Sequence, residues 1–179
     1  MGRKIFTYIM LVIVYLILAV PFKVMEVIPG FADIRPVTLL GPVYALFYGV
    51  PGCIIFAVMN LVMDFVSGGI AWSSIAGLLA NFAGPFLIMY YWKMKAKKTL
   101  HLRTMGNIGH YCLTLIIAAL LEALIITPSV AAFYPDVNWR LFFVSVFLNT
   151  ALFPILFGIP FIILIQEELG FKQISPKDV

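Results

Sequence analysis

The chain has 179 residues, of which 63% are hydrophobic and only 11% are charged, and its mean hydropathy is +1.07. A water-soluble domain of this length could not bury so much apolar surface, so the composition excludes that class and predicts an integral membrane protein. The formal net charge of +4 does not indicate a nucleic-acid partner, because the basic residues lie beside apolar segments, where membrane topology places them.

Apolar segments bounded by proline, glycine or charge predict the helices, since about 20 apolar residues cross a bilayer. The first segment ends in "PFK" and not at a small-residue cleavage site, so we expect it to remain in the protein. The second and third are short and meet at "GVPG". There Pro51-Gly52 favours a tight turn, with one long helix or a re-entrant pair as the alternative. We predict an all-α membrane protein, a single six-transmembrane-helix bundle over 1–179, with helices at about 4–21, 37–50, 52–66, 74–93, 107–127 and 140–166.

The distribution of basic residues predicts that the N- and C-termini are cytoplasmic. This orientation places nine basic residues inside and three outside, as the positive-inside rule requires. The inner ones are Arg3, Lys4, Lys93, Lys95, Lys97, Lys98, Arg103, Lys172 and Lys177, and the outer ones are Lys23, Arg35 and Arg140. We expect the basic run "KMKAKK" to face lipid headgroups, and we assign it no ligand.

Polar side chains inside the predicted spans need a partner or a cavity. They are Asn60, Asp64, Asn81, Glu122 and Asn149. Asn60 and Asp64 are four residues apart and therefore share one face of a helix near its outer end. Glu122 and Asn149 also lie toward the outer half of their helices. Together these residues outline a polar cavity that is open to the outside, with Arg35 at its rim.

Several of these side chains are equally compatible with a role in helix packing. Hydrogen bonding between helices accounts for Asn81 and Asn149 equally well, and Asp64 could also lie at a helix interface. The carboxyl of Glu122 has apolar neighbours on both sides and must find a cation, a donor or a proton; Arg35 and Arg140 are candidate partners. Trp72 belongs by default to the aromatic belt at the membrane surface, although a tryptophan beside a polar cavity could stack on a flat ligand.

The sequence does not predict an enzyme, a metal site or a bound cofactor. His110 and Glu122 are twelve residues apart, which is roughly 18 Å along a helix and too far for a catalytic pair. An intramembrane enzyme that uses Glu122 or Asp64 as an acid or base is disfavoured, because no nucleophile and base are clustered. Cys53 and Cys112 lie in apolar segments without metal-ligand partners nearby. No phosphate loop of the form G-x-x-x-x-G-K occurs, so ATP-driven work would need another chain.

Residues 28–64 carry a resemblance to a known family. They combine "IPGFADIRP", a Pro- and Gly-rich helix "LLGPVYALFYGVPG" and a helix that ends in "NLVMD". This order, within six predicted spans, resembles the substrate-binding S-components of energy-coupling factor (ECF) transporters. The resemblance implies a multi-pass protein of the bacterial cytoplasmic membrane, whose pocket captures a vitamin or similar micronutrient at the outer face. It implies as partners a transmembrane coupling subunit and two cytoplasmic ATPase subunits.

Under this resemblance the mixed charges favour a zwitterionic or multiply hydrogen-bonding ligand. The predicted substrate-binding residues are Arg35, Asn60, Asp64, Trp72, Asn81, Glu122 and Asn149. The alternative is a structural or regulatory membrane protein without a small-molecule ligand, in which the same side chains hold helices together.

The first helix departs from the family, because "IFTYIMLVIVYLILAV" lacks the Ala-x-x-x-Ala pattern that docks the coupling subunit there. Small residues at a spacing of four occur instead at Gly41, Ala45 and Gly49. Such a pattern lets two helices approach closely, either within the chain or at a docking surface for a partner.

Overall fold

The structure is a computed structural model that describes residues 2–22, 25–28, 32–68, 71–95 and 100–175. Among the residues used to predict orientation, Lys23, Lys97, Lys98 and Lys177 lie outside these ranges.

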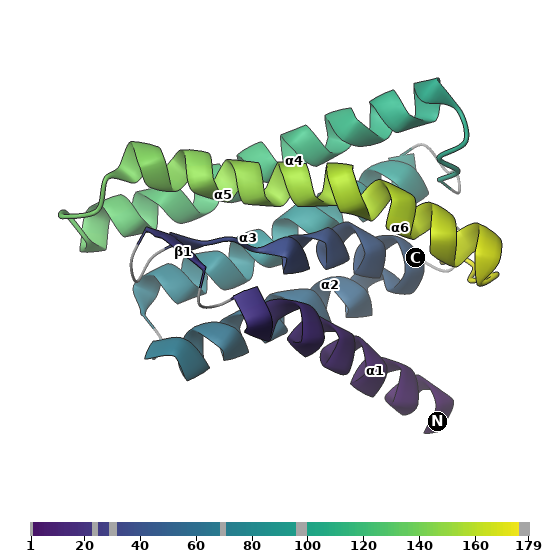
Figure 1. Cartoon of the computed structure of the whole chain (residues 1–179), viewed down its shortest axis with the longest axis horizontal. Coiled ribbons are helices and arrows are strands. Elements are labelled where there is room, and N and C mark those ends of the chain that lie inside the picture. Colours follow the sequence, from purple (N-terminus) through teal and green to yellow (C-terminus); the bar gives the residue numbers. More distant parts are fainter. Residues whose placement is uncertain (1, 23–24, 29–31, 69–70, 96–99, 176–179) are drawn as a thin grey trace.

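Long helices lie side by side along the longest axis of the molecule (Figure 1). In the described ranges, five helices are long and apolar enough to cross a membrane: Lys4–Phe22, Pro36–Val66, Trp72–Met94, Met105–Phe133 and Trp139–Glu168. The structure thus supports a helical membrane protein.

The N-terminal part of the chain forms one helix and a short hairpin before the main bundle. Helix α1 spans Gly2–Ala19 and continues as a 3-10 turn, η1, over Val20–Phe22. Strand β1 (Glu26–Ile28) pairs antiparallel with β2 (Ala32–Asp33). A second 3-10 turn, η2 (Pro36–Leu39), then leads into α2, which spans Leu40–Gly68. Residue 35 lies between β2 and η2, and β1 lies toward the end of the molecule away from the N-terminus (Figure 1).

The remaining helices follow as three long rods. Helix α3 (Trp72–Met89) continues as a π-helical turn, η3, over Tyr90–Lys95. Helix α4 spans Met105–Phe133. The last rod consists of α5 (Trp139–Phe153), η4 (Pro154–Gly158), α6 (Ile159–Ile163) and η5 (Leu164–Glu168). Helix α1 begins and η5 ends toward the same end of the molecule, away from β1 (Figure 1).

Helix α2 reverses direction at Gly49 and therefore consists of two arms. Gly49 has φ 66° and ψ −145°, a conformation outside the helical region that glycine adopts without a steric penalty. A straight helix would separate Tyr44 from Gly52 by about 12 Å. Instead, a Cβ on Gly52 would overlap with the carbonyl oxygen of Tyr44. The two arms are therefore antiparallel neighbours, as the ribbon also shows (Figure 1).

The predicted boundary between two short helices is thus displaced from Pro51-Gly52 to Gly49. Pro51 belongs to the first turn of the second arm, where its missing N–H leaves no hydrogen bond unmade. Gly52 serves instead as the point of closest approach between the arms.

The small residues with a spacing of four in the first arm contribute to packing inside the chain. A Cβ on Gly41 would lie 3.0 Å from Pro85 of α3 and 3.2 Å from the ring of Phe56. Ala45 and Gly49 are also buried. Gly41, Ala45 and Gly49 are thus packed inside the chain, as the intramolecular alternative expects.

Helix α1 lies at the edge of the bundle and is fastened to both arms of α2. The hydroxyl of Tyr44 donates a hydrogen bond of 2.6 Å to the carbonyl oxygen of Leu11. The ring of Tyr15 meets that of Phe56 edge-on, with centroids 5.7 Å apart. Most other side chains of α1 are exposed, as expected for a helix that faces lipid on one side.

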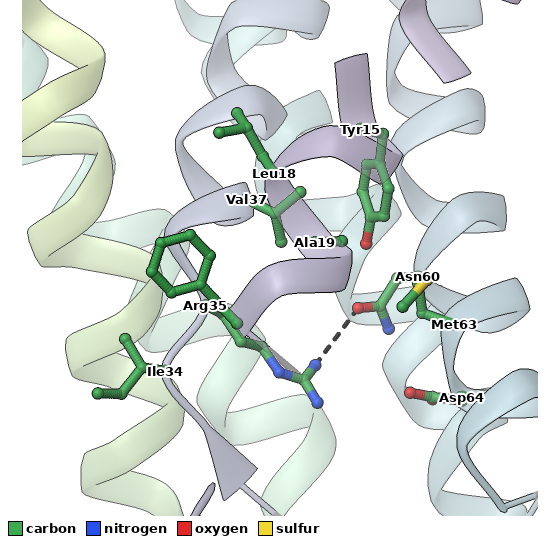
Figure 2. A pocket seen from close by; sticks show the side chains of 10 residues that line it. Tyr15, Leu18, Ala19, Ile34, Arg35, Val37, Asn60, Met63 and Asp64 are labelled. Carbon is green, nitrogen blue, oxygen red and sulfur yellow. Dashed lines mark hydrogen bonds between the residues drawn. The ribbon is translucent and has the colours of Figure 1, made fainter. Parts of the chain in front are cut away.

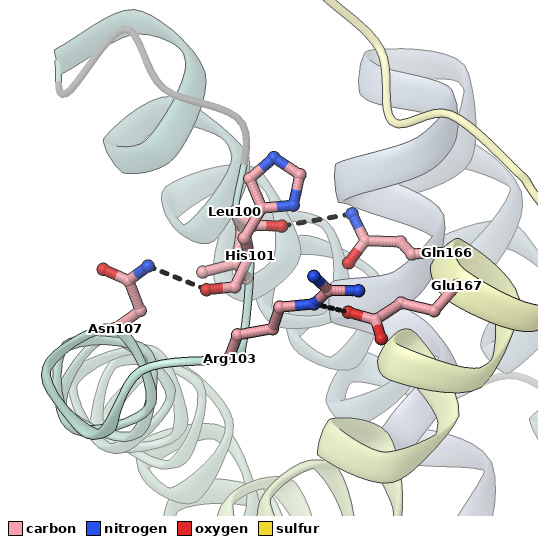
Figure 3. A network of polar contacts seen from close by, with 6 residues as sticks. All are labelled: Leu100, His101, Arg103, Asn107, Gln166 and Glu167. Carbon is pink, nitrogen blue, oxygen red and sulfur yellow. Dashed lines mark hydrogen bonds and ion pairs between the residues drawn. The ribbon is translucent and has the colours of Figure 1, made fainter.

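A network of amides joins the chain after η5 to the segment before α4. Leu100 donates its N–H to Gln173 Oε1 (3.1 Å), and its carbonyl oxygen accepts from Gln173 Nε2 (2.9 Å) and Gln166 Nε2 (3.1 Å). Nearby, Arg103 pairs with Glu167 and Asn107 donates to the carbonyl of His101 (Figure 3). The ammonium of Lys93 is fully buried and donates to Gln173 Oε1 at 2.6 Å. The side chain of Gln173 thus forms hydrogen bonds with both Leu100 and Lys93.

Replacing Gly52 with Ala should destabilise the protein by about 1–3 kcal/mol, because the added methyl group forces the two arms of α2 apart. Gly109→Ala in α4 is the matched control, since a Cβ there meets no atom within 4 Å. Thermal unfolding in detergent measures both variants. Equal melting temperatures for Gly52→Ala and Gly109→Ala would contradict the close approach of the arms.

Replacing Gln173 with Leu should also destabilise the protein, by about 1–3 kcal/mol or more, because the buried ammonium of Lys93 loses its acceptor. The same change in a Lys93→Met background should have a smaller effect. Lys172→Ala, at an exposed neighbouring position, is the control. Chemical unfolding in detergent gives the free energies of unfolding, and an unchanged effect in the Lys93→Met background would rule out the coupling.

Candidate functional site

Asn149 of α5 forms hydrogen bonds with the segment that leads into the first arm of α2. The backbone N–H of Arg35 donates to Asn149 Oδ1 at 2.9 Å. The hydroxyl of Thr38 lies 2.8 Å from the carbonyl oxygens of both Asn149 and Arg35, and its single proton can be donated to either. Residues more than a hundred positions apart in the sequence are therefore held together at this end of the bundle.

The side chain of Arg35 reaches the second arm of α2. Its Nη1 donates to Asn60 Oδ1 at 3.3 Å (Figure 2). Asn60 is buried, so this bond satisfies an oxygen that has little access to water. Three predicted site residues, Arg35, Asn60 and Asn149, are thus connected by direct hydrogen bonds.

A small pocket with a cavity volume of about 20 Å³, open to solvent, lies beside the Arg35–Asn60 contact. Asp64, one turn after Asn60, lines it as well, so these two residues share one face of the helix as their spacing predicts. The other walls are largely apolar. They are formed by Tyr15, Leu18, Ala19 and Phe22 at the end of α1 and η1, by Ile34 and Val37 on either side of Arg35, and by Met63 of α2.

The carboxylate of Asp64 is the distinctive group of this pocket. In the described part of the chain it has no hydrogen bond and no ion pair. Figure 2 shows it pointing from α2 toward the side of the pocket on which Arg35 lies, yet the two residues do not pair directly. A carboxylate only accepts hydrogen bonds, so the pocket offers an acceptor for a donor that enters it.

Asn81 and Glu122 lie elsewhere, between α3 and α4. Asn81 Nδ2 donates to the carbonyl oxygen of Gly77 in its own helix at 2.7 Å. Glu122 is only 5% exposed, and a Cβ on Gly84 would overlap with its carboxyl group. Among the described residues the Glu122 carboxyl has no hydrogen-bond or ion-pair partner. It therefore pairs with neither of its two predicted partners.

Trp72 and Arg140 both lie outside the pocket. Trp72, at the start of α3, is 66% exposed and stacks on Phe133 near the end of α4, with centroids 6.1 Å apart and planes at 18°. This position fits an assignment of Trp72 to the aromatic belt. The guanidinium of Arg140 lies over the ring of Trp139 at 5.2 Å.

Sequence reasoning missed Thr38 and the contribution of α1 to the pocket. A hydroxyl two residues after Pro36, within an apolar segment, was the available signal for Thr38. The pocket side of α1 has no such signal, because Tyr15, Leu18 and Ala19 do not differ in type from the residues that face outward. Only the packing of α1 against α2 selects them.

Replacing Gly84 with Ala should destabilise the protein by about 1–3 kcal/mol, because the new methyl group occupies the space of the Glu122 carboxyl. In a Glu122→Ala background the same change should have little effect, which gives a coupling energy of about 0.5–3 kcal/mol. Gly77→Ala, where a Cβ meets its nearest atom at 3.8 Å, is the control on the same helix. Thermal unfolding of the four proteins in the cycle measures the coupling, and simple additivity would contradict the contact.

Comparison with protein-family models, with curated proteins and with solved structures found no match for this chain. Within the described residues, no group of three or more His, Cys, Asp or Glu side chains could hold a metal ion. The pocket beside Arg35, Asn60 and Asp64 is therefore the candidate functional site.

Proposed function

We propose that the chain is a membrane-embedded substrate-binding subunit, which captures a vitamin or similar small micronutrient at the outer face of a bacterial cytoplasmic membrane for ATP-driven uptake of the ECF type. The observation that carries this proposal is the pocket in which Arg35, Asn60 and Asp64 meet. A cation beside apolar walls, with a carboxylate that no described residue pairs with, has the features of a small-molecule site. Such sites are mostly hydrophobic cavities in which a few polar groups orient the ligand.

The arrangement of the chain supports the proposed direction of capture. The pocket is at the end of α1 opposite to its N-terminus, so a cytoplasmic N-terminus places the pocket at the outer face. If both arms of α2 cross the bilayer, the chain crosses six times and ends on the side where it begins. The sequence has no phosphate loop, so ATP hydrolysis is assigned to two cytoplasmic ATPase subunits, linked through a transmembrane coupling subunit.

A structural or regulatory role without a small ligand is the second candidate. The hydrogen bonds of Asn149 and Asn60 favour it, because both join segments that are distant in sequence and hold the bundle together. It does not account for Asp64, whose carboxylate contributes to no such link among the described residues. The two candidates therefore differ in what they predict for Asp64.

Mass spectrometry of small molecules released from the detergent-purified protein tests the proposal, with an unrelated membrane protein as the control. We expect one enriched micronutrient at a stoichiometry near one to one. A panel of vitamins, measured by ligand-induced shifts in melting temperature, serves as the complementary assay. An empty, well-folded protein that binds no member of the panel would favour the structural or regulatory role.

Replacing Arg35 or Asp64 with Ala should weaken binding of the identified micronutrient about tenfold or more, since each change removes a charged hydrogen-bonding group from the pocket. Glu168→Ala, at an exposed position beyond α6, should leave the affinity unchanged. Titration calorimetry gives the affinities, and thermal unfolding checks that each variant is folded. Unchanged affinity in both pocket variants would remove this pocket from the binding site.

A further inference from the structure

We propose that the carboxyl of Glu122 is a buried proton-binding site, which exchanges its proton with solvent through the side-chain amides of Asn81 and Asn60 and the pocket beside them. This inference goes beyond the proposed function, because it requires neither a micronutrient nor a wider pocket. Three features support it. They are a buried carboxyl without a partner, the scarcity of charge on the elements packed against it, and a row of buried amides that leads to the pocket.

The surroundings of Glu122 favour a carboxyl that carries a proton. The residue is only 5% exposed, and no described residue donates a hydrogen bond to its carboxyl or forms an ion pair with it. An ionised carboxylate without a partner is far more costly in an apolar interior than a neutral carboxylic acid. Binding one proton converts the carboxylate into the neutral acid, which also has an O–H donor. The bound proton therefore takes the place of a cationic partner.

The elements around Glu122 offer almost no charge that could replace the proton. Those that pack most extensively against α4 are α3, α5 and η4. Neither α3 nor η4 contains a charged or titratable residue. Helix α5 contains only Arg140, at its start, and this guanidinium lies over a neighbouring tryptophan ring. The other titratable residues of α4 are His110, Tyr111 and Cys112, which are about 15 Å or more from Glu122 along the helix.

A row of buried amides leads from Glu122 toward the second arm of α2. The Glu122 carboxyl occupies the position that a Cβ on Gly84 would take. Asn81 lies three residues before Gly84 on the same buried face of α3, where Cβ positions are about 5–6 Å apart. Its Nδ2 donates to the carbonyl oxygen of Gly77 at 2.7 Å. A Cβ on Gly77 would lie 3.8 Å from Asn60 Nδ2, so both amides border Gly77.

The row of amides reaches solvent at the pocket. Asn60 lines the pocket together with Asp64 (Figure 2). The cavity volume of about 20 Å³ is enough for about one water molecule. Side-chain amides offer both donors and acceptors to water, and a proton can move along water that is held in this way. The carboxylate of Asp64, which has no partner among the described residues, attracts a proton to this opening.

The charge of Glu122 also affects how two helices pack. Release of the proton would leave a negative charge against the backbone of Gly84, where α3 and α4 meet. Binding of the proton removes this charge and favours the close approach of the two helices. Proton exchange through the pocket would thus connect the pH at this end of the bundle with the packing of α3 against α4.

Infrared difference spectroscopy of the full-length protein in detergent tests whether Glu122 holds a proton. At neutral pH we expect the carbonyl band of a protonated carboxylic acid, which shifts when H2O is replaced by D2O. Glu122→Gln, which keeps the shape of the side chain, should abolish this band. Asp64→Asn and Glu168→Gln remove carboxyl groups at the pocket and at an exposed position, and both variants should retain it.

The rate of proton exchange tests the path. The rate is measured from the shift of the Glu122 band after rapid mixing with D2O. Asn81→Leu and Asn60→Leu should each slow the exchange about tenfold or more, because each removes groups that hold water. Asn107→Leu, near the opposite end of α4, should not change the rate. Thermal unfolding checks that each variant is folded, and a valine variant replaces any leucine variant that is not.

The possible outcomes distinguish this inference from the proposed function. The inference is overturned if the band is absent at neutral pH, or if it persists in Glu122→Gln. It is also overturned if the band appears only when sodium ions are replaced by choline, since the site then holds a metal cation. Unchanged exchange rates in the Asn81 and Asn60 variants would overturn it as well. None of these results depends on binding of a micronutrient, so the proposed function stands or fails separately.

Discussion

The reversal of the chain at Gly49 is the constraint on which the rest of the structure depends. Arg35 lies fourteen residues before Gly49 and Asn60 eleven residues after it, so a straight helix through this region would place them far apart. The positive φ of Gly49 turns the second arm back along the first. The close approach at Gly52 then lets the arms pack together. The contact between Arg35 and Asn60, and with it the pocket, exists only because of this turn.

Arg35 has two roles that use different parts of the residue. Its backbone N–H binds Asn149 and so belongs to the scaffold that joins the first arm of α2 to α5. Its side chain borders the pocket and binds Asn60. Within a membrane protein such polar links persist because lipid offers no competing donors or acceptors. Asp64 differs from these residues, since its carboxylate takes part in no link among the described residues and faces the pocket instead.

Glu122 illustrates a different use of a polar residue inside the bundle. Its side chain packs against the backbone of Gly84, in a space that any larger side chain at position 84 would occupy. The two helices α3 and α4 can approach closely there, in the manner of small residues at membrane helix interfaces. The carboxyl is therefore part of the interface between α3 and α4 and lies outside the pocket that Arg35 and Asp64 share.

The sequence by itself determined that the protein is a helical membrane protein, and it identified the polar residues that lipid does not tolerate without a partner or a cavity. These properties follow from composition and from local spacing, which is why Asn60 and Asp64 were placed correctly on one face of a helix. Glycine and proline near residue 50 likewise indicated a break in the helix.

Only the tertiary structure decided which polar residues meet. Arg35, Asn60 and Asn149 are joined across long stretches of chain, while Glu122, Asn81 and Trp72, which have the same polar or aromatic character, lie elsewhere. The position of the break at Gly49 also depended on the fold, because Pro51 is compatible with the first turn of a helix and only the packing of the two arms shows where the chain reverses. Partners over such separations depend on how helices pack, and hydrophobic patterns in one sequence do not encode this.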